Sequence, residues 1–330
     1  MSGSSELRSI AERSLRSALL ALSRRRTVGR LATRLPVARG MVRRFVAGET
    51  LEEALGALSA LKAAGYRTTV DILGESVTSA ADAARAADAY VDAIGALAQR
   101  DLDRNVSLKL SQMGLAIDET LCRENVARVV TRASEVGAFV RIDMEDHATV
   151  DRTLAIWEAV RPHARRGDSV AEGSGCGVVI QAALRRSHDD LERLIAAGTR
   201  VRLCKGAYQE PASVAFQDKA EVDAAYEALM TRLLESGTYP AIATHDVRLI
   251  RRAQQIAEDL RLARDRFEFQ MLYGVRRDLQ EQLRSAGYRV RVYVPFGDQW
   301  YPYFMRRLAE RPANVAFVLR SVFREGRRGG

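Results

Sequence analysis

The sequence predicts an α/β fold, a (β/α)8 barrel with additional N-terminal helices. Three observations predict it. Eight short β-rich runs recur from residue 67 onward, each run is followed by a segment long enough for a helix, and a chain of 330 residues that is 47% hydrophobic can bury one large core. A doubly wound open sheet is the alternative, but the glycine-rich turn expected after its first strand is missing.

The elements follow in order from residues 50–64, which we expect to form a helix entering the first strand. The strands are predicted at 67–73 (RTTVDIL), 105–110 (NVSLKL), 139–144 (FVRIDM), 177–181 (GVVIQ), 200–206 (RVRLCKG), 240–245 (PAIATH), 267–272 (FEFQML) and 289–295 (RVRVYVP). Residues 218–237 and 246–265 are typical of the intervening helices, and GSGCG at 173–177 is predicted to be a connecting loop. We predict two parts, an N-terminal helical arm over 1–64 and a catalytic barrel with C-terminal helices over 65–330.

The net charge of +9 is concentrated at the two ends of the chain. Residues 1–49 hold eleven arginines against three acidic residues, whereas the chain without 1–49 and 320–330 has 36 basic and 38 acidic residues. A basic stripe on the folded body is therefore disfavoured. Nucleic-acid binding is disfavoured as well, because it would need such a stripe. The arginine-rich arm fits solvated helices, and it also fits a transit peptide or a membrane-surface helix, so we expect any peripheral membrane contact to involve residues 1–44.

The three cysteines and four histidines do not cluster, which argues against a disulfide framework and against a metal site. No apolar run approaches the ~18 residues of a membrane span. We therefore expect a cytoplasmic protein, with any membrane association peripheral and at the inner face.

Polar side chains gather at the predicted C-terminal ends of the strands, where barrel enzymes place their reactive groups. They are Glu75, Lys109, Asp143, Gln181, Arg202, Lys205, Tyr208, Thr244, His245 and Tyr293. The chain has 47 arginines and only four lysines, and two of those four, Lys109 and Lys205, stand at strand ends. A compact ammonium suits a phosphate or a carboxylate network where a guanidinium would not.

A helix near the C-terminus carries an unusual polar face. In YPYFMRRLAE, residues 301–310, the side chains of Tyr303, Arg306, Arg307 and Glu310 share one face of a helix that we expect to begin near Pro302. Two adjacent arginines on such a face require counter-charges or an anionic ligand.

Together these segments resemble the proline dehydrogenase family. DILGES, SLKLSQMG, RIDMED, VVIQA, RLCKGAYQEP, IATHD, FEFQMLYGV and YVPFGDQWYPYFMRRLAERPAN are similar to its successive signatures, in order, over residues 66–320. The resemblance implies a distorted, FAD-bearing (β/α)8 TIM barrel that oxidises L-proline to Δ1-pyrroline-5-carboxylate and passes electrons to a quinone or another acceptor. It also implies the monofunctional form.

The resemblance assigns roles around the substrate. Arg306 and Arg307 would bind the proline carboxylate, with Glu75 and Asp143 as counter-charges and Lys109 completing the ion network. The pyrrolidine ring would be enclosed by Tyr208, Tyr293, Tyr303 and Leu272. Tyr293 would crowd a ring hydroxyl, which favours proline over hydroxyproline. The implied catalytic residues are Asp143, Tyr208 and Arg202.

Around the flavin, Arg202 would lie near the reactive edge of the ring, where a positive charge favours the reduced form. Lys205 with the amides of Gly206 and Ala207 would hold the pyrophosphate. Gln181, Thr244 and His245 would supply further hydrogen bonds, although a structural role for His245 is the competing interpretation. Glu310 would be a flavin contact or an i,i+4 partner of Arg306.

Two other functions fit parts of the sequence. A lyase or aldolase barrel would use Lys109 or Lys205 as a Schiff base. A tethering protein would bind membrane or nucleic acid through the arginine-rich arm.

Overall fold

The structure is a computed structural model that describes residues 42–74, 77–164 and 175–309. Its internal contacts divide the chain into two compact units. The barrel unit is Leu55–Val294, and the terminal unit combines residues up to Ala54 with those from Pro295 onward. The predicted division into an arm over 1–64 and a barrel over 65–330 stays a prediction, because residues 1–41 and 310–330 lie outside the described part of the chain.

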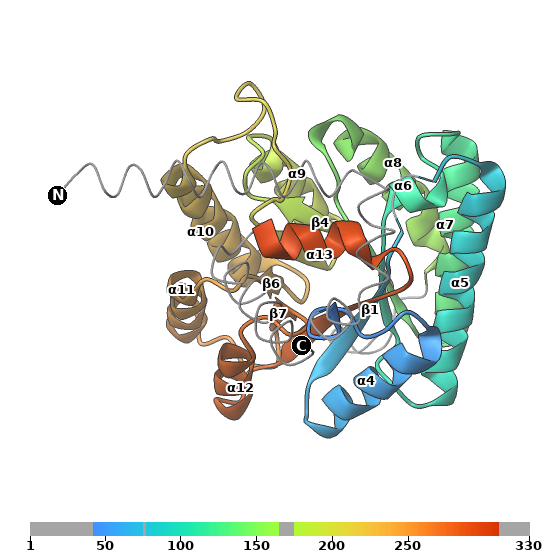
Figure 1. The fold of residues 1–330 in the computed structure, drawn as a ribbon. Helices are drawn as coiled ribbons and strands as arrows, with labels where there is room; N and C mark the ends of the chain where they lie inside the picture. The colour runs from blue at the N-terminus through green and yellow to red at the C-terminus, as the bar shows by residue number, and fades with distance from the viewer. Residues whose placement is uncertain (1–41, 75–76, 165–174, 310–330) are drawn as a thin grey trace, which may run out of the picture. The chain divides into compact units, whose positions relative to one another are not determined.

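Eight parallel strands close into a barrel in the order of the sequence (Figure 1). They are β1 (Arg67–Ile72), β2 (Asn105–Leu108), β3 (Phe139–Ile142), β4 (Gly175–Gln181), β5 (Val201–Cys204), β6 (Ala241–Ala243), β7 (Glu268–Leu272) and β8 (Val290–Phe296). The predicted barrel is confirmed, and each predicted run overlaps a strand.

One predicted loop is wrong, because residues Gly175 to Gly177 of GSGCG belong to β4. Gly177 is opposite Arg141 of β3, and a Cβ there would lie 2.3 Å from the Arg200 carbonyl oxygen and 2.9 Å from Arg141 Nη1. The glycine therefore permits close packing inside the barrel, a role that turn propensity alone does not reveal.

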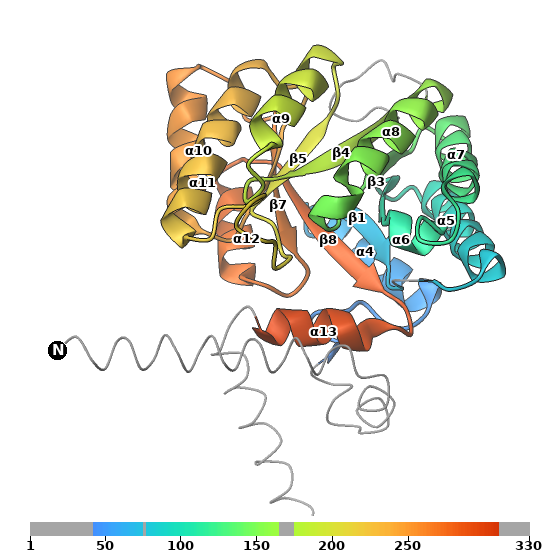
Figure 2. The same ribbon diagram turned by 90° about the horizontal axis from the view of Figure 1, so that it is seen from above.

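Helices surround the strands, as two views of the barrel unit show (Figures 1 and 2). The helices of this unit are α4 (Leu51–Ala63, from Leu55 onward), α5 (Ala80–Gln99), α6 (Leu110–Met113), α7 (Glu119–Glu135), α8 (Val150–Val160), α9 (Ser187–Ala196), α10 (Lys219–Ser236), α11 (Val247–Asp259) and α12 (Arg277–Ser285), with short 3-10 turns at His147–Thr149 and Arg161–His163. The terminal unit holds α13 (Trp300–Ala309). Side chains cap several N-termini: Ser79 accepts from the Asp82 amide, and Asp218 with Glu221 forms a capping box on α10. These caps fix where α5 and α10 begin.

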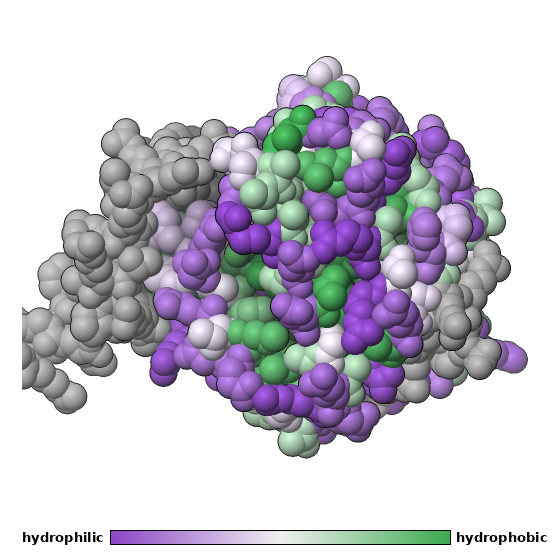
Figure 3. Space-filling model, turned by 90° about the vertical axis from the view of Figure 1, so that its right-hand side faces the viewer, coloured by the Kyte–Doolittle hydropathy of each residue, from purple (hydrophilic) through white to green (hydrophobic). Residues whose placement is uncertain are grey.

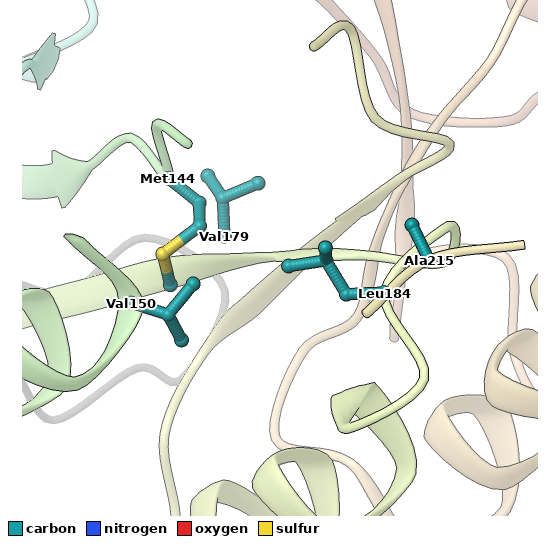
Figure 4. Packing of buried hydrophobic residues seen from close by; sticks show 5 residues of the cluster. All are labelled: Met144, Val150, Val179, Leu184 and Ala215. Carbon is teal, nitrogen blue, oxygen red and sulfur yellow. The ribbon is translucent and has the colours of Figure 1, made fainter. Parts of the chain in front are cut away.

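Apolar side chains fill the layer between strands and helices. One cluster packs Met144, Val150, Val179, Leu184 and Ala215 between β4, α8 and the loop that precedes α10 (Figure 4). On the outer face, around α5 and α7, hydrophilic residues alternate with small hydrophobic areas (Figure 3). The helices thus bury one face and present the other to water.

The interior of the barrel is polar instead of aliphatic. On β7, Glu268 and Gln270 are buried at alternate positions, and Arg291 of β8 donates from Nε to Glu268 Oε1 at 2.8 Å. The Arg141 guanidinium lies 4.7 Å from the centre of the Phe139 ring and donates to the Val178 carbonyl oxygen at 3.0 Å. Charged side chains therefore lie beneath the strand ends that carry the predicted site.

In the terminal unit, the segment before α4 pairs with the segment after β8. The Ala47 amide donates to the Pro295 carbonyl at 2.8 Å, and the Gly297 amide to the Gly48 carbonyl at 3.0 Å. Trp300 Nε1 donates to Glu49 Oε1 at 3.1 Å. Helix α13 begins at Trp300, two residues before the predicted start at Pro302.

Candidate active site

Four predicted site residues meet at the C-terminal ends of the strands, around the carboxylate of Asp143. Arg202 Nη1 donates to Asp143 Oδ1 at 2.7 Å, and the Tyr293 hydroxyl donates to Oδ2 at 2.8 Å. Lys109 Nζ lies 3.6 Å from the same Oδ2 and 3.1 Å from Asp71 Oδ1. The strand order therefore brings together Lys109, Asp143, Arg202 and Tyr293, which are far apart in sequence. The role of Asp143 as a counter-charge to Arg306 and Arg307 stays a prediction.

Burial controls the protonation of two groups in this cluster. The side chain of Asp71 is 1% exposed, and this burial raises the pKa of its carboxyl, with the Lys109 charge opposing the shift and Asp143 adding to it. Burial, together with the charges of Asp143 and Asp71, raises the pKa of Tyr293 well above its usual range. Tyr293 therefore stays a neutral phenol and acts as the donor to Asp143.

The guanidinium of Arg202 donates hydrogen bonds to three side chains. Besides its bond to Asp143, its Nε donates to Gln270 Oε1 at 2.5 Å and its Nη2 donates to Ser107 Oγ at 2.9 Å. The Tyr293 ring lies 5.2 Å from the guanidinium carbon. A buried cation held by a carboxylate, an amide and a hydroxyl provides a positive charge at a set position.

Sequence reasoning missed three members of this cluster: Asp71, Ser107 and Gln270. A signal was present for two of them, because an acid in the apolar run TTVDIL and a glutamine at alternate spacing in FEFQML are unusual in buried strands. Ser107 gives no such signal, since serine is common in any setting.

A second cluster surrounds Lys205, at the end of β5. Its Nζ lies 2.5 Å from Asp223 Oδ1 and 3.1 Å from Asp246 Oδ2. Lys219 and Arg248 pair with the same two carboxylates, so three cations meet two anions and one positive charge is in excess. Burial would raise the pKa of Asp223, but hydrogen bonds from Lys205, Lys219 and Arg248 hold it well below its usual range.

The loop that follows Lys205 begins with a glycine in a backbone conformation that other residues rarely adopt. Gly206 has φ +109°, and a Cβ there would lie 3.2 Å from both Ala183 Cβ and Gln181 Oε1. Gln181 Nε2 donates to the Glu145 carbonyl at 2.7 Å, which fixes the amide beside the glycine. The exposed backbone of Gly206 and Ala207 is thus open to close approach by a ligand.

The remaining predicted contacts of the barrel unit lie at the ends of β6 and β7 or after β5. His245 Nε2 accepts from the Leu272 amide at 3.0 Å, and Thr244 Oγ1 accepts from the Asp246 amide at 3.1 Å. The first bond joins β6 to β7, which gives one ring nitrogen of His245 a structural role. Tyr208 lies in the loop after β5 and is 44% exposed.

Helix α13 carries Tyr303, Arg306 and Arg307 in the terminal unit. The Arg307 guanidinium carbon lies 5.1 Å from the centre of the Tyr303 ring, a cation–π contact along the predicted polar face. Glu75 and Glu310 lie outside the described residues, so the pairing of Glu75 with the arginines and the role of Glu310 stay predictions.

Neither strand-end lysine has the surroundings of a Schiff-base nucleophile. Lys109 and Lys205 each lie within ion-pair distance of two carboxylates. Such an arrangement suits a charge held in place, which disfavours the lyase alternative. Over the described part of the chain, no helix is both long enough and apolar enough to cross a membrane.

Comparison with known proteins agrees with this geometry. The sequence model of the family described as proline dehydrogenase matches residues 54–320. Proline dehydrogenase 1 of Bacillus subtilis (strain 168) is 39% identical over 311 residues, which cover 94% of this chain and 100% of that protein. Proline dehydrogenase of Deinococcus radiodurans is 41% identical over 312 residues, covering 94% and 98%.

Solved structures show the same barrel. Proline utilization A from Bdellovibrio bacteriovorus, in a crystal of the protein inactivated by N-propargylglycine, aligns with a TM-score of 0.74 at 30% identity. The match covers 82% of this chain and 32% of that larger protein. The chain belongs to the proline dehydrogenase family.

Proposed function

We propose that this protein oxidises L-proline to Δ1-pyrroline-5-carboxylate with FAD as its cofactor, the first step of proline catabolism. The observation that carries the proposal is the buried cluster of Lys109, Asp143, Arg202 and Tyr293 at the strand ends of a chain in this family. Its charges are fixed before any substrate arrives, which is what electrostatic positioning requires.

In the proposed reaction the amine of proline is deprotonated and the C5–H bond breaks as a hydride. The electron pair of the nitrogen forms the C5–N double bond, and the proton left on nitrogen is released to solvent. Tyr293 and Leu272, which are opposite each other on β8 and β7, would bound the ring, with Tyr208 and Tyr303. Arg306 and Arg307 would bind the carboxylate through their planar forks.

The residues around Lys205 fit a flavin dinucleotide. Gly206 leaves room that a Cβ would fill, and the neighbouring charged cluster has one positive charge in excess, which suits a pyrophosphate. Lys205, Gly206 and Ala207 would hold that group, and Gln181, Thr244 and His245 would contribute hydrogen bonds. FAD, when bound, supplies the acceptor for the hydride.

We further propose that a quinone or another acceptor reoxidises the cofactor, which the family resemblance supports. We also propose that the protein is cytoplasmic, with any membrane contact made through residues 1–44. The arginine-rich composition of that arm supports an attraction to anionic lipid.

The visible spectrum of the purified protein, with and without L-proline, tests the central proposal. A flavin spectrum that bleaches under anaerobic conditions on adding proline is expected. A colourless protein that does not take up added FAD, or a flavin that proline leaves oxidised, would contradict it.

A further inference from the structure

A continuous line of hydrogen bonds runs through the barrel interior to the candidate active site. Arg291 Nε donates to Glu268 Oε1, and Gln270 Nε2 donates to the same carboxylate oxygen at 2.5 Å. Gln270 Oε1 accepts from Arg202 Nε at 2.5 Å, and Arg202 Nη1 donates to Asp143 Oδ1. All five side chains lie within the barrel unit.

The polarity of this line leaves Gln270 one orientation. A carboxylate only accepts hydrogen bonds and a guanidinium only donates them, so the amide NH2 must face Glu268 and the amide oxygen must face Arg202. Both neighbours are buried, and Gln270 itself is 4% exposed, so water does not replace either bond. The charge of Glu268 thus fixes the dipole of Gln270, which in turn fixes Arg202.

We propose that Gln270 is a positioning residue for Arg202, and that Glu268 acts through Gln270. The inference rests on the proposed function, because the consequence of placing Arg202 is the geometry of Asp143 and Tyr293 in the proline site. Without the Gln270 oxygen, Arg202 loses one of its three hydrogen-bonded partners and turns toward the other two.

The first test replaces Gln270 with Met, which keeps the length of the side chain and removes both bonds. A matched control is Asn125→Leu, because Asn125 is a buried amide on α7 whose hydrogen bonds, to the Met113 carbonyl at 3.1 Å and from Arg128, involve no member of the Asp143 cluster. Both variants should lose thermal stability. Only Gln270→Met should lower kcat/KM for proline, by about ten- to a hundredfold, the range for a lost hydrogen bond to a charged group.

The flavin midpoint potential is the second measurement, because a merely structural role would not move it. A displaced Arg202 stabilises the reduced flavin less, so Gln270→Met should lower the potential. A tenfold change in the equilibrium constant corresponds to about 30 mV for a two-electron couple. Asn125→Leu should keep the wild-type potential.

A reciprocal exchange provides the rescue. The double variant is Glu268→Gln, Gln270→Glu. The carboxylate now at position 270 accepts from Arg202, and the amide now at position 268 donates to that carboxylate and accepts from Arg291. Net charge and polarity are conserved, so kcat/KM should return to within about threefold of the wild type. The single variant Gln270→Glu places two carboxylates side by side and should be less stable than the double variant.

Crystal structures separate this inference from the proposed function. In Gln270→Met, the distance from Arg202 Nη1 to Asp143 Oδ1 should change, whether or not the protein oxidises proline. An unmoved Arg202 would overturn the positioning role, as would a variant with wild-type potential and kcat/KM. A wild type that binds no flavin would refute the proposed function, while the Arg202 position would still decide the role of Gln270.

Discussion

The hydroxyl of Tyr293 on β8 donates to Oδ2 of Asp143, the residue after β3, at 2.8 Å. The other oxygen of the same carboxylate accepts from Arg202. A neutral phenol and a guanidinium thus hold Asp143 from two sides, and Lys109 stands beside it. The carboxylate has little freedom to turn when a substrate enters or leaves.

Replacing Tyr293 with Phe keeps the ring and removes the bond to Asp143. We expect FAD to stay bound and kcat/KM for proline to fall about ten- to a hundredfold, because the lost bond is to a charged acceptor and is worth about 1.5–3 kcal/mol. Tyr226→Phe is the control, since its buried hydroxyl donates at 3.2 Å to an uncharged acceptor, the backbone carbonyl of Leu203. Steady-state kinetics that show equal losses in both variants would argue against a special role for the Asp143 contact.

Glu268 should make stability depend on pH in acid. Burial would raise its pKa, but the charge and hydrogen bond of Arg291, with Arg200 and Gln270, lower it from 4.5 to about 2. A lowered folded-state pKa stabilises the protein above the unfolded value, and that stabilisation is lost as the pH falls from about 4.5 toward 2.

The shift corresponds to about 3 kcal/mol, of which about 2 kcal/mol should be lost by pH 3. The measurement is urea unfolding of the wild type and Glu268→Gln at several pH values. The difference between their free energies of unfolding should shrink as the pH falls from 6 to 3. A difference that is constant over this range would mean that Glu268 is not held ionised by its partners.

Two glycines allow a matched test of the proposed flavin contact. Gly206→Ala introduces a side chain at φ +109° and 3.2 Å from Gln181 Oε1, whereas Gly198→Ala has φ +67° with nothing within 4 Å. Both variants should lose about 1–2 kcal/mol of stability from the backbone conformation. Only Gly206→Ala should weaken FAD binding, by about tenfold or more, measured by titrating apoprotein with FAD. Equal FAD affinity in the two variants would exclude a close approach at Gly206.

Arg307→Met removes one planar fork from the polar face of α13 and keeps its length. FAD should remain bound, and kcat/KM for proline should fall about 30- to 1,000-fold, for a charge-assisted carboxylate contact of roughly 2–4 kcal/mol. Pyrrolidine, which lacks the carboxylate, should lose little between wild type and variant. Unchanged kcat/KM for proline would show that Arg307 does not bind the carboxylate.

Removing residues 1–44 should leave bound FAD and its reduction by proline intact, because the first strand of the barrel begins at Arg67. The truncated chain keeps Ala47 and Gly48, whose backbones pair with Pro295 and Gly297. Absorbance at the flavin bands before and after adding proline is the measurement. Loss of FAD from the truncated protein would show that the arm is part of the folded core.

The barrel could be predicted because strand and helix patterns alternate along the chain, and the gathering of the Asp143 cluster could be predicted because its members lie in or just after β2, β3, β5 and β8, toward one rim of the barrel. Asp71 was missed although its place in an apolar run was a signal, since the partners of a buried acid inside a strand are supplied only by the closed barrel. The same holds for Asp223 and Asp246, which reach Lys205 across 18 and 41 residues of sequence. The start of β4 was missed because glycines are typical of loops, whereas here Gly175 packs against Phe139 and Gly177 against Arg141.

Strand β7 alternates between two environments. Glu268 and Gln270 face the interior, while Phe269 lies edge-on against Phe267 and Tyr288 on the opposite face. Successive side chains of a strand point to opposite faces. Deleting one residue from β7 would therefore turn polar side chains outward and aromatic side chains into the barrel interior. The protein should therefore tolerate few insertions or deletions within β7, even where it tolerates conservative substitutions. Homologous chains are expected to vary in length in their surface loops instead.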